Sequence, residues 1–174
     1  DNLRRSGEEL SKLFDIICTV VEQIASLDRW HLRLLGNLSL LPDQVQQRLQ
    51  RAVDQTRTAS PLTVNIAVGY GGREEITEAV RNLLLEKAQE GATLETVARE
   101  LSVDEITSHV YTAGQPDPDL VIRTSGEQRL SGFLMWQSTH SEYYFCEAFW
   151  PDFRKIDFYR ALRDFALRER RMGK

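Results

Sequence analysis

The chain has 174 residues, of which 41% are hydrophobic and 28% charged, with a formal net charge of −4 at pH 7. This length suits one domain, and the composition excludes collagen, low-complexity chains and small disulfide scaffolds. The negative total argues against a general affinity for nucleic acid, and no apolar run approaches the ~20 residues that cross a bilayer. Cys18 and Cys146 lack the paired spacing of a zinc or redox site. We therefore expect a globular cytoplasmic protein with buried free thiols.

Helices and strands alternate along the first half of the chain. Ser6 and Glu9 have the spacing of a capping box, and apolar residues then recur at helical intervals. The alternating residues 30–35 predict a short strand, and Pro42 opens a second helix. The branched residues within 62–68 predict a second strand.

The second half continues this alternation. Its predicted segments are a helix from Ile76 to Gly91, two short helices within 93–110, a strand at 120–122, a helix at 131–139, a strand at 143–145 and a final helix at 157–171. The second of the two short helices is expected to be capped by Ser102, with Glu105 at its third position. Strands separated by helices predict an α/β single domain with a parallel central sheet flanked by helices. Ligands bind such sheets beyond the carboxyl ends of the strands, which indicates the loops 69–73 and 123–131.

The loop 123–131 combines two arginines with hydroxyl groups directly before a predicted helix. Arg123 and Arg129 can each bind phosphate oxygens in a bidentate manner, and Ser131 can donate a further hydrogen bond. Free amides at the start of the helix would add positive potential. Two guanidinium groups suit a diphosphate better than a monophosphate. The spacing leaves a second interpretation open, in which Glu127 and Arg129 form only a surface ion pair worth ~0–1 kcal/mol.

A longer stretch around this loop resembles a known family. Residues 116–137 read PDPDLVIRTSGEQRLSGFLMWQ and are continued by similar matches at 141–145 and 150–153. This stretch resembles the signature of the cis-prenyltransferases, the undecaprenyl diphosphate synthase type of enzyme. Residues 1–2 resemble the end of that family's Ser/Thr, acidic, Asn motif, and residues 69–73 resemble its Asn-Tyr-Gly-Gly-Arg turn. The resemblance extends over the whole chain.

The resemblance implies an enzyme that joins isopentenyl diphosphate to an allylic prenyl diphosphate and forms a Z-isoprenyl diphosphate with Mg²⁺ as cofactor. It implies that Arg123, Arg129 and Ser131 bind the diphosphate of isopentenyl diphosphate. Glu142 matches a carboxylate that the family associates with the metal. Because Mg²⁺ prefers one or two carboxylates together with phosphate oxygens and water, Glu142 suffices only if another ligand comes from elsewhere.

Both ends of the chain carry further matches. Asn2 matches the catalytic position near the allylic diphosphate and the departing proton, and Arg5 matches a nearby basic residue that binds substrate. Arg171 and Gly173 resemble the Arg-x-Gly tail that reaches the partner's isopentenyl diphosphate, which implies a homodimer. The charges alone also allow a solvent-exposed last helical turn, whose cations complement the helix dipole.

Departures from the family pattern bear on the product. Leu3 stands where long-chain members usually carry Trp, which favours the short-chain subgroup that makes (2Z,6E)-farnesyl diphosphate. The alternatives are a long-chain undecaprenyl or decaprenyl diphosphate synthase, a lavandulyl-type irregular synthase and a non-catalytic scaffold subunit. Contact with a membrane is expected only for a long product.

The family's amino-terminal motif, which supplies the principal magnesium ligand, has no match within residues 1–174. We therefore interpret residues 1–174 as one catalytic domain that apparently lacks its amino-terminal part. The first strand of the sheet is expected upstream of the chain.

Overall fold

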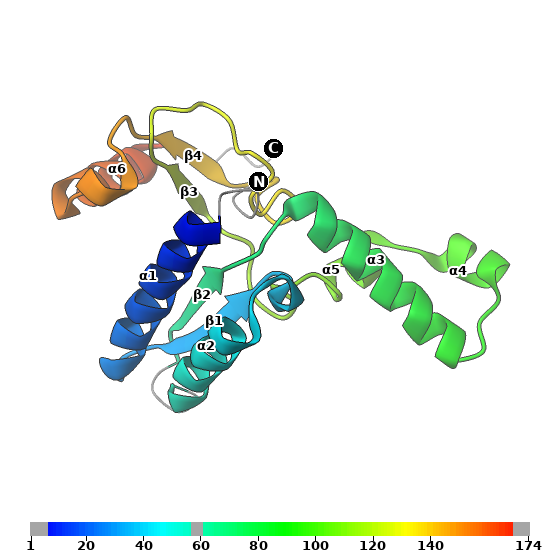
Figure 1. Ribbon diagram of the computed structural model, residues 1–174. Helices are drawn as coiled ribbons and strands as arrows, with labels where there is room; N and C mark the ends of the chain where they lie inside the picture. The colour runs from blue at the N-terminus through cyan, green and yellow to red at the C-terminus, as the bar shows by residue number, and fades with distance from the viewer. Residues whose placement is uncertain (1–6, 57–60, 169–174) are drawn as a thin grey trace. The chain divides into compact units, whose positions relative to one another are not determined.

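The computed structural model describes residues 7–56 and 61–168 (Figure 1). The chain divides into two compact units, Asp1–Gly71 and Gly72–Lys174. The described residues contain both helices and strands, and every strand pair among them is parallel, which confirms the predicted α/β class. The parallel strands form one pair in each unit, β1 with β2 and β3 with β4. The assignment of all 174 residues to one catalytic domain stays a prediction.

The first unit consists of two helices packed with a parallel strand pair. Its elements are α1 (Gly7–Ser26), β1 (His31–Leu35), the 3-10 helix η2 (Leu38–Leu40), α2 (Asp43–Gln55) and β2 (Thr63–Ala67). The strands run in register from His31↔Thr63 to Leu35↔Ala67 and lie side by side in Figure 1. Four segments therefore follow the predicted order with shifts of a few residues. The capping box predicted at Ser6 lies outside the described residues.

Apolar residues at helical spacing build the core of this unit. Phe14, Cys18 and Val21 lie on one face of α1 and are buried against Leu32 of β1 and Leu49 of α2. Cys18 is a buried free thiol, as predicted, and its burial raises the pKa of the thiol. Cys146 is also a free thiol but is only partly buried, so the prediction of burial is wrong for Cys146. The close packing of these side chains explains why the sequence period identified both helices.

The second unit carries the remaining elements. These are α3 (Gly72–Gln89), α4 (Leu94–Glu100), α5 (Val103–Thr107), β3 (Leu120–Arg123), β4 (Glu142–Phe145), the 3-10 helix η3 (Trp150–Asp152) and α6 (Lys155–Leu167). The capping box of Ser102 and Glu105 is present at the start of α5, as predicted. Strands β3 and β4 run in parallel from Leu120↔Glu142 to Arg123↔Phe145. No helix among the described residues is long and apolar enough to span a membrane.

The helix predicted at 131–139 is wrong, because this segment is a series of turns. Ser131, Gly132 and Leu134 have φ angles of 52°, 79° and 45°. These left-handed conformations interrupt the run of right-handed residues that an α-helix requires. This correction also removes the helix start from which amide groups were expected to face an anion.

The start of α3 fixes this turn segment. A Cβ on Gly72 would lie 2.0 Å from the carbonyl oxygen of Gly132, so only glycine permits this approach. One turn later, buried Glu75 accepts a hydrogen bond of 2.9 Å from the side-chain amide of Gln137. The same Gln137 amide donates to the hydroxyl of Thr112 at 3.1 Å. These buried hydrogen bonds join the end of the turn segment to α3 and to Thr112, and they satisfy the side-chain amide nitrogen of Gln137.

Candidate anion-binding site

Strand β3 places Arg123 at its carboxyl end, and a tight loop follows. The carbonyl of Arg123 accepts a hydrogen bond of 2.7 Å from the amide of Cys146. Ser125 and Gly126 then turn the chain with φ angles of 79° and 70°. The amide of Ser125 donates to the carbonyl of Ala148 at 2.8 Å, and the amide of Gly126 donates to the carbonyl of Cys146 at 2.9 Å. The loop is therefore held by backbone hydrogen bonds to the segment that follows β4.

The two predicted arginines meet at one carboxylate. An Nη2 donor of Arg123 bonds to Oε2 of Glu127, and Nη2 of Arg129 donates to Oε1 at 2.8 Å. The side chain of Arg123 is 24% exposed, whereas that of Arg129 is 71% exposed. The structure thus brings both guanidinium groups together. The alternative interpretation, in which Glu127 and Arg129 form only a surface ion pair, does not describe this arrangement, because Glu127 pairs with Arg123 as well as with Arg129.

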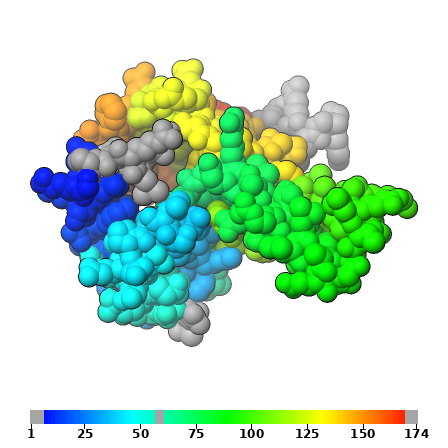
Figure 2. All heavy atoms as spheres, turned by 45° about the vertical axis from the view of Figure 1, so that its right-hand side comes forward, coloured from blue at the N-terminus to red at the C-terminus, as the bar shows by residue number. Residues whose placement is uncertain are grey.

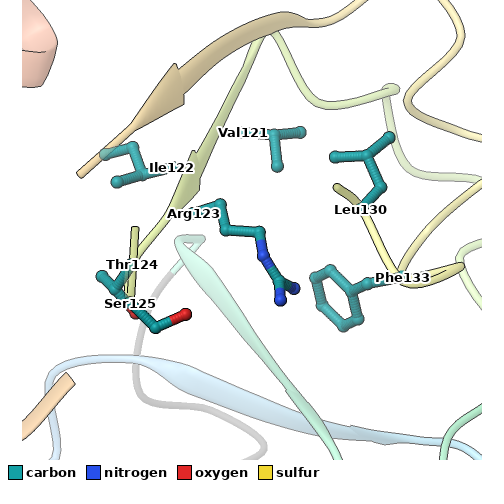
Figure 3. A pocket seen from close by; sticks show the side chains of 7 residues that line it. All are labelled: Val121, Ile122, Arg123, Thr124, Ser125, Leu130 and Phe133. Carbon is teal, nitrogen blue, oxygen red and sulfur yellow. The ribbon is translucent and has the colours of Figure 1, made fainter. Parts of the chain in front are cut away.

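A cavity of about 240 Å³ opens beside Arg123 (Figure 3). The polar residues Arg123, Thr124 and Ser125 at the end of β3 line one part of it. Apolar side chains line the rest, namely Val121, Ile122, Leu130 and Phe133. Figure 3 shows the guanidinium group of Arg123 extending across the cavity in the direction of Phe133. The Nε atom of Arg123 is buried and has no hydrogen-bond partner within the described structure. Because a buried donor without an acceptor costs ~1–3 kcal/mol, this nitrogen is suited to a ligand oxygen.

The backbone around the cavity is strained. Ser125 and Ser131 are not glycines, yet both have a positive φ. Such conformations cost on the order of 1–3 kcal/mol and cluster at ligand-binding and active sites. Ser131 is exposed and stands in a turn. Its predicted contact with a diphosphate stays a prediction, as do those of Arg123 and Arg129.

Glu142 begins β4 and is engaged by a cation. Nη1 of Arg168 donates to the Glu142 carboxylate at 2.8 Å, and Nη2 of Arg168 donates to Asp164 at 2.7 Å. Hydrogen bonds to these two carboxylates raise the pKa of the Arg168 guanidinium. The described residues contain no group of three or more His, Cys, Asp or Glu that could hold a metal ion. Glu142 therefore suits Mg²⁺ only as one carboxylate among substrate phosphates and water.

Four other predicted site residues lie outside the described residues. These are Asn2, Arg5, Arg171 and Gly173. Their roles stay predictions that derive from the family resemblance.

Sequence reasoning missed three features of the site. One is the pairing of Arg123 with Glu127, although the i, i+4 spacing of opposite charges was visible. Another is the ion pair of Arg168 with Glu142, which joins α6's carboxyl end to β4 across 26 residues and leaves no local signal. The third is the apolar wall from Leu130 and Phe133, since the segment that contains Phe133 was predicted to be a helix.

Parallel strands together with helices define an α/β protein, a class in which ligands bind beyond the carboxyl ends of the strands. The chain belongs to the undecaprenyl diphosphate synthase family, since the family model described as "Putative undecaprenyl diphosphate synthase" matches residues 1–173. The match crosses both compact units. It confirms the resemblance that the motif at 116–137 indicated.

Individual relatives agree with this assignment. The chain is 55% identical to "Isoprenyl transferase 1" of Corynebacterium diphtheriae, over 100% of this chain and 66% of the relative. It is 54% identical to "(2Z,6E)-farnesyl diphosphate synthase" of Mycolicibacterium smegmatis, over 100% of this chain and 67% of the relative. The chain thus spans about two thirds of the length of these relatives.

Solved structures share the fold. The crystal structure of lavandulyl diphosphate synthase from Lavandula x intermedia, in complex with dimethylallyl diphosphate, matches with a TM-score of 0.88 and 30% sequence identity. This match covers 99% of the chain and 75% of the lavender protein. The predicted fold of the undecaprenyl diphosphate synthase type is therefore confirmed.

Proposed function

We propose that the protein containing this chain is a cis-prenyltransferase that condenses isopentenyl diphosphate with an allylic prenyl diphosphate into a short-chain Z-isoprenyl diphosphate. The arrangement of Arg123 and Arg129 around Glu127, beside a cavity with one polar and one apolar side, is the observation that carries this proposal. Isopentenyl diphosphate likewise has a polar part, the diphosphate group, and an apolar part, a short hydrocarbon. The similarity to a (2Z,6E)-farnesyl diphosphate synthase supports the short chain, as does Leu3.

Each proposed residue acts on charge or position. Arg123, Arg129 and Ser131 hold the head of isopentenyl diphosphate, and the apolar wall excludes water from its alkene. The alkene attacks the allylic carbon, whose bond to diphosphate breaks, and the new product loses one proton. The family resemblance assigns Asn2 a catalytic role at the allylic diphosphate and the departing proton, and it assigns Arg5 a role in substrate binding.

Glu142 serves as one ligand of Mg²⁺ in this proposal. When bound, Mg²⁺ would stabilise the negative charge on the leaving diphosphate. Removal of divalent cations with a chelator is therefore expected to abolish turnover, and added Mg²⁺ to restore it.

We further propose a cytoplasmic homodimer in which Arg171 and Gly173 reach the partner's site. Helices α3 to α5, green in Figure 2, expose several apolar side chains, which are Leu84, Leu85, Leu94, Leu101 and Val103. Exposed apolar side chains of this kind are common at protein–protein contacts. The net charge of −4 argues against nucleic acid as a partner, whereas the local arginines can bind small anionic substrates. A membrane partner is expected only for a long product.

An irregular synthase is a second candidate, because a lavandulyl diphosphate synthase shares the fold with a TM-score of 0.88. A scaffold subunit is disfavoured, since Arg123, Arg129 and Ser131 are all present. A long-chain synthase remains an alternative that product size can separate from these.

Incubation of the full protein with labelled isopentenyl diphosphate and geranyl diphosphate tests the proposal. We expect a product that contains one added isopentenyl unit with a Z double bond, identified by chromatography and mass spectrometry. Many added units would instead indicate a long-chain synthase. In a parallel incubation with dimethylallyl diphosphate alone, coupling of two of these molecules would indicate irregular chemistry. Absence of any product with all substrate pairs would refute the proposed activity.

A further inference from the structure

Glu127 joins two side chains that carry the same charge. Without a carboxylate between them, the guanidinium groups of Arg123 and Arg129 would repel each other. Arg129 is 71% exposed, so solvent alone would allow its long side chain many rotamers. Glu127 binds one arginine with each of its two oxygens, which limits both the separation and the direction of the guanidinium groups.

The two bonds leave other donors available. An arginine has five N–H donors, and Glu127 engages an Nη2 group on each of the two. The buried Nε of Arg123 is not engaged by Glu127 or by another described residue. The backbone hydrogen bonds of Ser125 and Gly126 fix the loop and bring Glu127 back towards Arg123. Glu127 can thus hold the arginines without occupying the whole site.

We infer that Glu127 is a positioning residue that sets the spacing of Arg123 and Arg129 for a ligand with two phosphate groups, so that the site prefers diphosphates to monophosphates. This inference rests on the diphosphate site of the proposed function. A ligand that spans both guanidinium groups depends on their mutual placement. A single phosphate that binds one guanidinium group does not.

Binding of inorganic pyrophosphate and inorganic phosphate to the full protein, measured by calorimetry, tests this role. In Glu127→Gln we expect the dissociation constant of pyrophosphate to rise about 10-fold, the effect of losing one charge-assisted contact. That of phosphate should stay unchanged or fall. The direction of the change in the pyrophosphate dissociation constant is informative, because removal of a negative charge by itself would tighten the binding of every anion.

Two further variants complete the design. Glu127→Asp keeps the charge but is one methylene shorter, so it cannot reach both arginines, and we expect the same loss of preference for pyrophosphate. Glu147→Gln makes the same charge change at an exposed residue just after β4 that forms no ion pair with a described residue. It should preserve the preference. Circular dichroism and thermal unfolding would verify that each variant is folded.

The outcomes separate the possible explanations. Tighter pyrophosphate binding in Glu127→Gln would overturn the inference and make Glu127 a competitor of the ligand. Equal changes for pyrophosphate and phosphate would overturn it as well. Failure of the wild-type protein to bind pyrophosphate would remove the site itself. Selective binding that depends on Glu127, without product formation from any substrate pair, would contradict the proposed function and leave the positioning role intact.

Discussion

The two arginines of the site differ in their surroundings. Arg123 is 24% exposed, stands at the end of a hydrogen-bonded strand and has a buried Nε. Arg129 is 71% exposed and is held mainly by Glu127. Hydrogen bonds strengthen where water is excluded, so Arg123 should contribute more to the binding of a diphosphate than Arg129.

Alanine substitutions test this ranking. Because hydrogen bonds to charged groups are worth ~1.5–3 kcal/mol, Arg123→Ala should raise the KM for isopentenyl diphosphate about 100-fold, and Arg129→Ala about 10-fold. The KM for the allylic substrate should change little. Steady-state kinetics with each substrate varied in turn would measure both. Arg99→Ala, which removes an exposed arginine on α4, is the control. Equal losses for both substrates would contradict the assignment.

At the residue scale, sequence reasoning identified both arginines and an ion pair of Glu127 with Arg129. It did not identify the pair of Glu127 with Arg123, because the shape of the intervening loop depends on positive φ angles at Ser125 and Gly126. Gly126 signalled such an angle, since glycine adopts it without steric cost. Ser125 did not.

Among the elements, the junction of α3 with the turns at 131–139 has the strictest packing. Gly72 begins α3 directly against the carbonyl of Gly132, and Glu75 and Gln137 form a buried hydrogen bond one turn further on. Ser131, which directly precedes Gly132, is predicted to bind the diphosphate. Stability and substrate binding should therefore be coupled at this junction.

Gly72→Ala tests the packing. Its Cβ would lie 2.0 Å from a backbone oxygen, so the backbone has to shift, and overpacking of this kind costs about 1–3 kcal/mol. We expect the free energy of unfolding to fall by about that amount and the KM for isopentenyl diphosphate to rise. Denaturant unfolding measures the first effect. Gly7→Ala, at a helix start with open space around it, should cause no loss. Equal unfolding midpoints for Gly72→Ala and the wild-type protein would refute the packing argument.

At the scale of the whole molecule, the family model spans residues 1–173 and thus both compact units. The proposed homodimer adds residues of a second chain to each site. Arg123 then serves the site in its own subunit, and Arg171 serves the site of the partner. In a symmetric dimer the two contributions can be separated by mixing variants.

Subunit mixing tests the exchange of tails. Arg123→Ala and Arg171→Ala should each impair turnover at low isopentenyl diphosphate concentration. After subunit exchange, half of the dimers are mixed, and one of their two sites has neither substitution, so about a quarter of wild-type activity should return. Native mass spectrometry would verify that mixed dimers form. If mixed dimers form and activity stays at the parental level, Arg171 acts within its own subunit or not at all.

The sequence by itself determined the order of helices and strands except for the segment 131–139, the capping box of Ser102 and Glu105, and the family. These features depend on neighbouring residues or on a contiguous motif, so they can be read without tertiary contacts. Only the tertiary structure decided that 131–139 is a series of turns, because the contact of Gly132 with Gly72 joins residues 60 positions apart. It also decided the pairing of Glu142 with Arg168 and the bridge that Glu127 makes between two arginines. Such contacts depend on how the backbone folds in space, and spacing along the chain does not encode them.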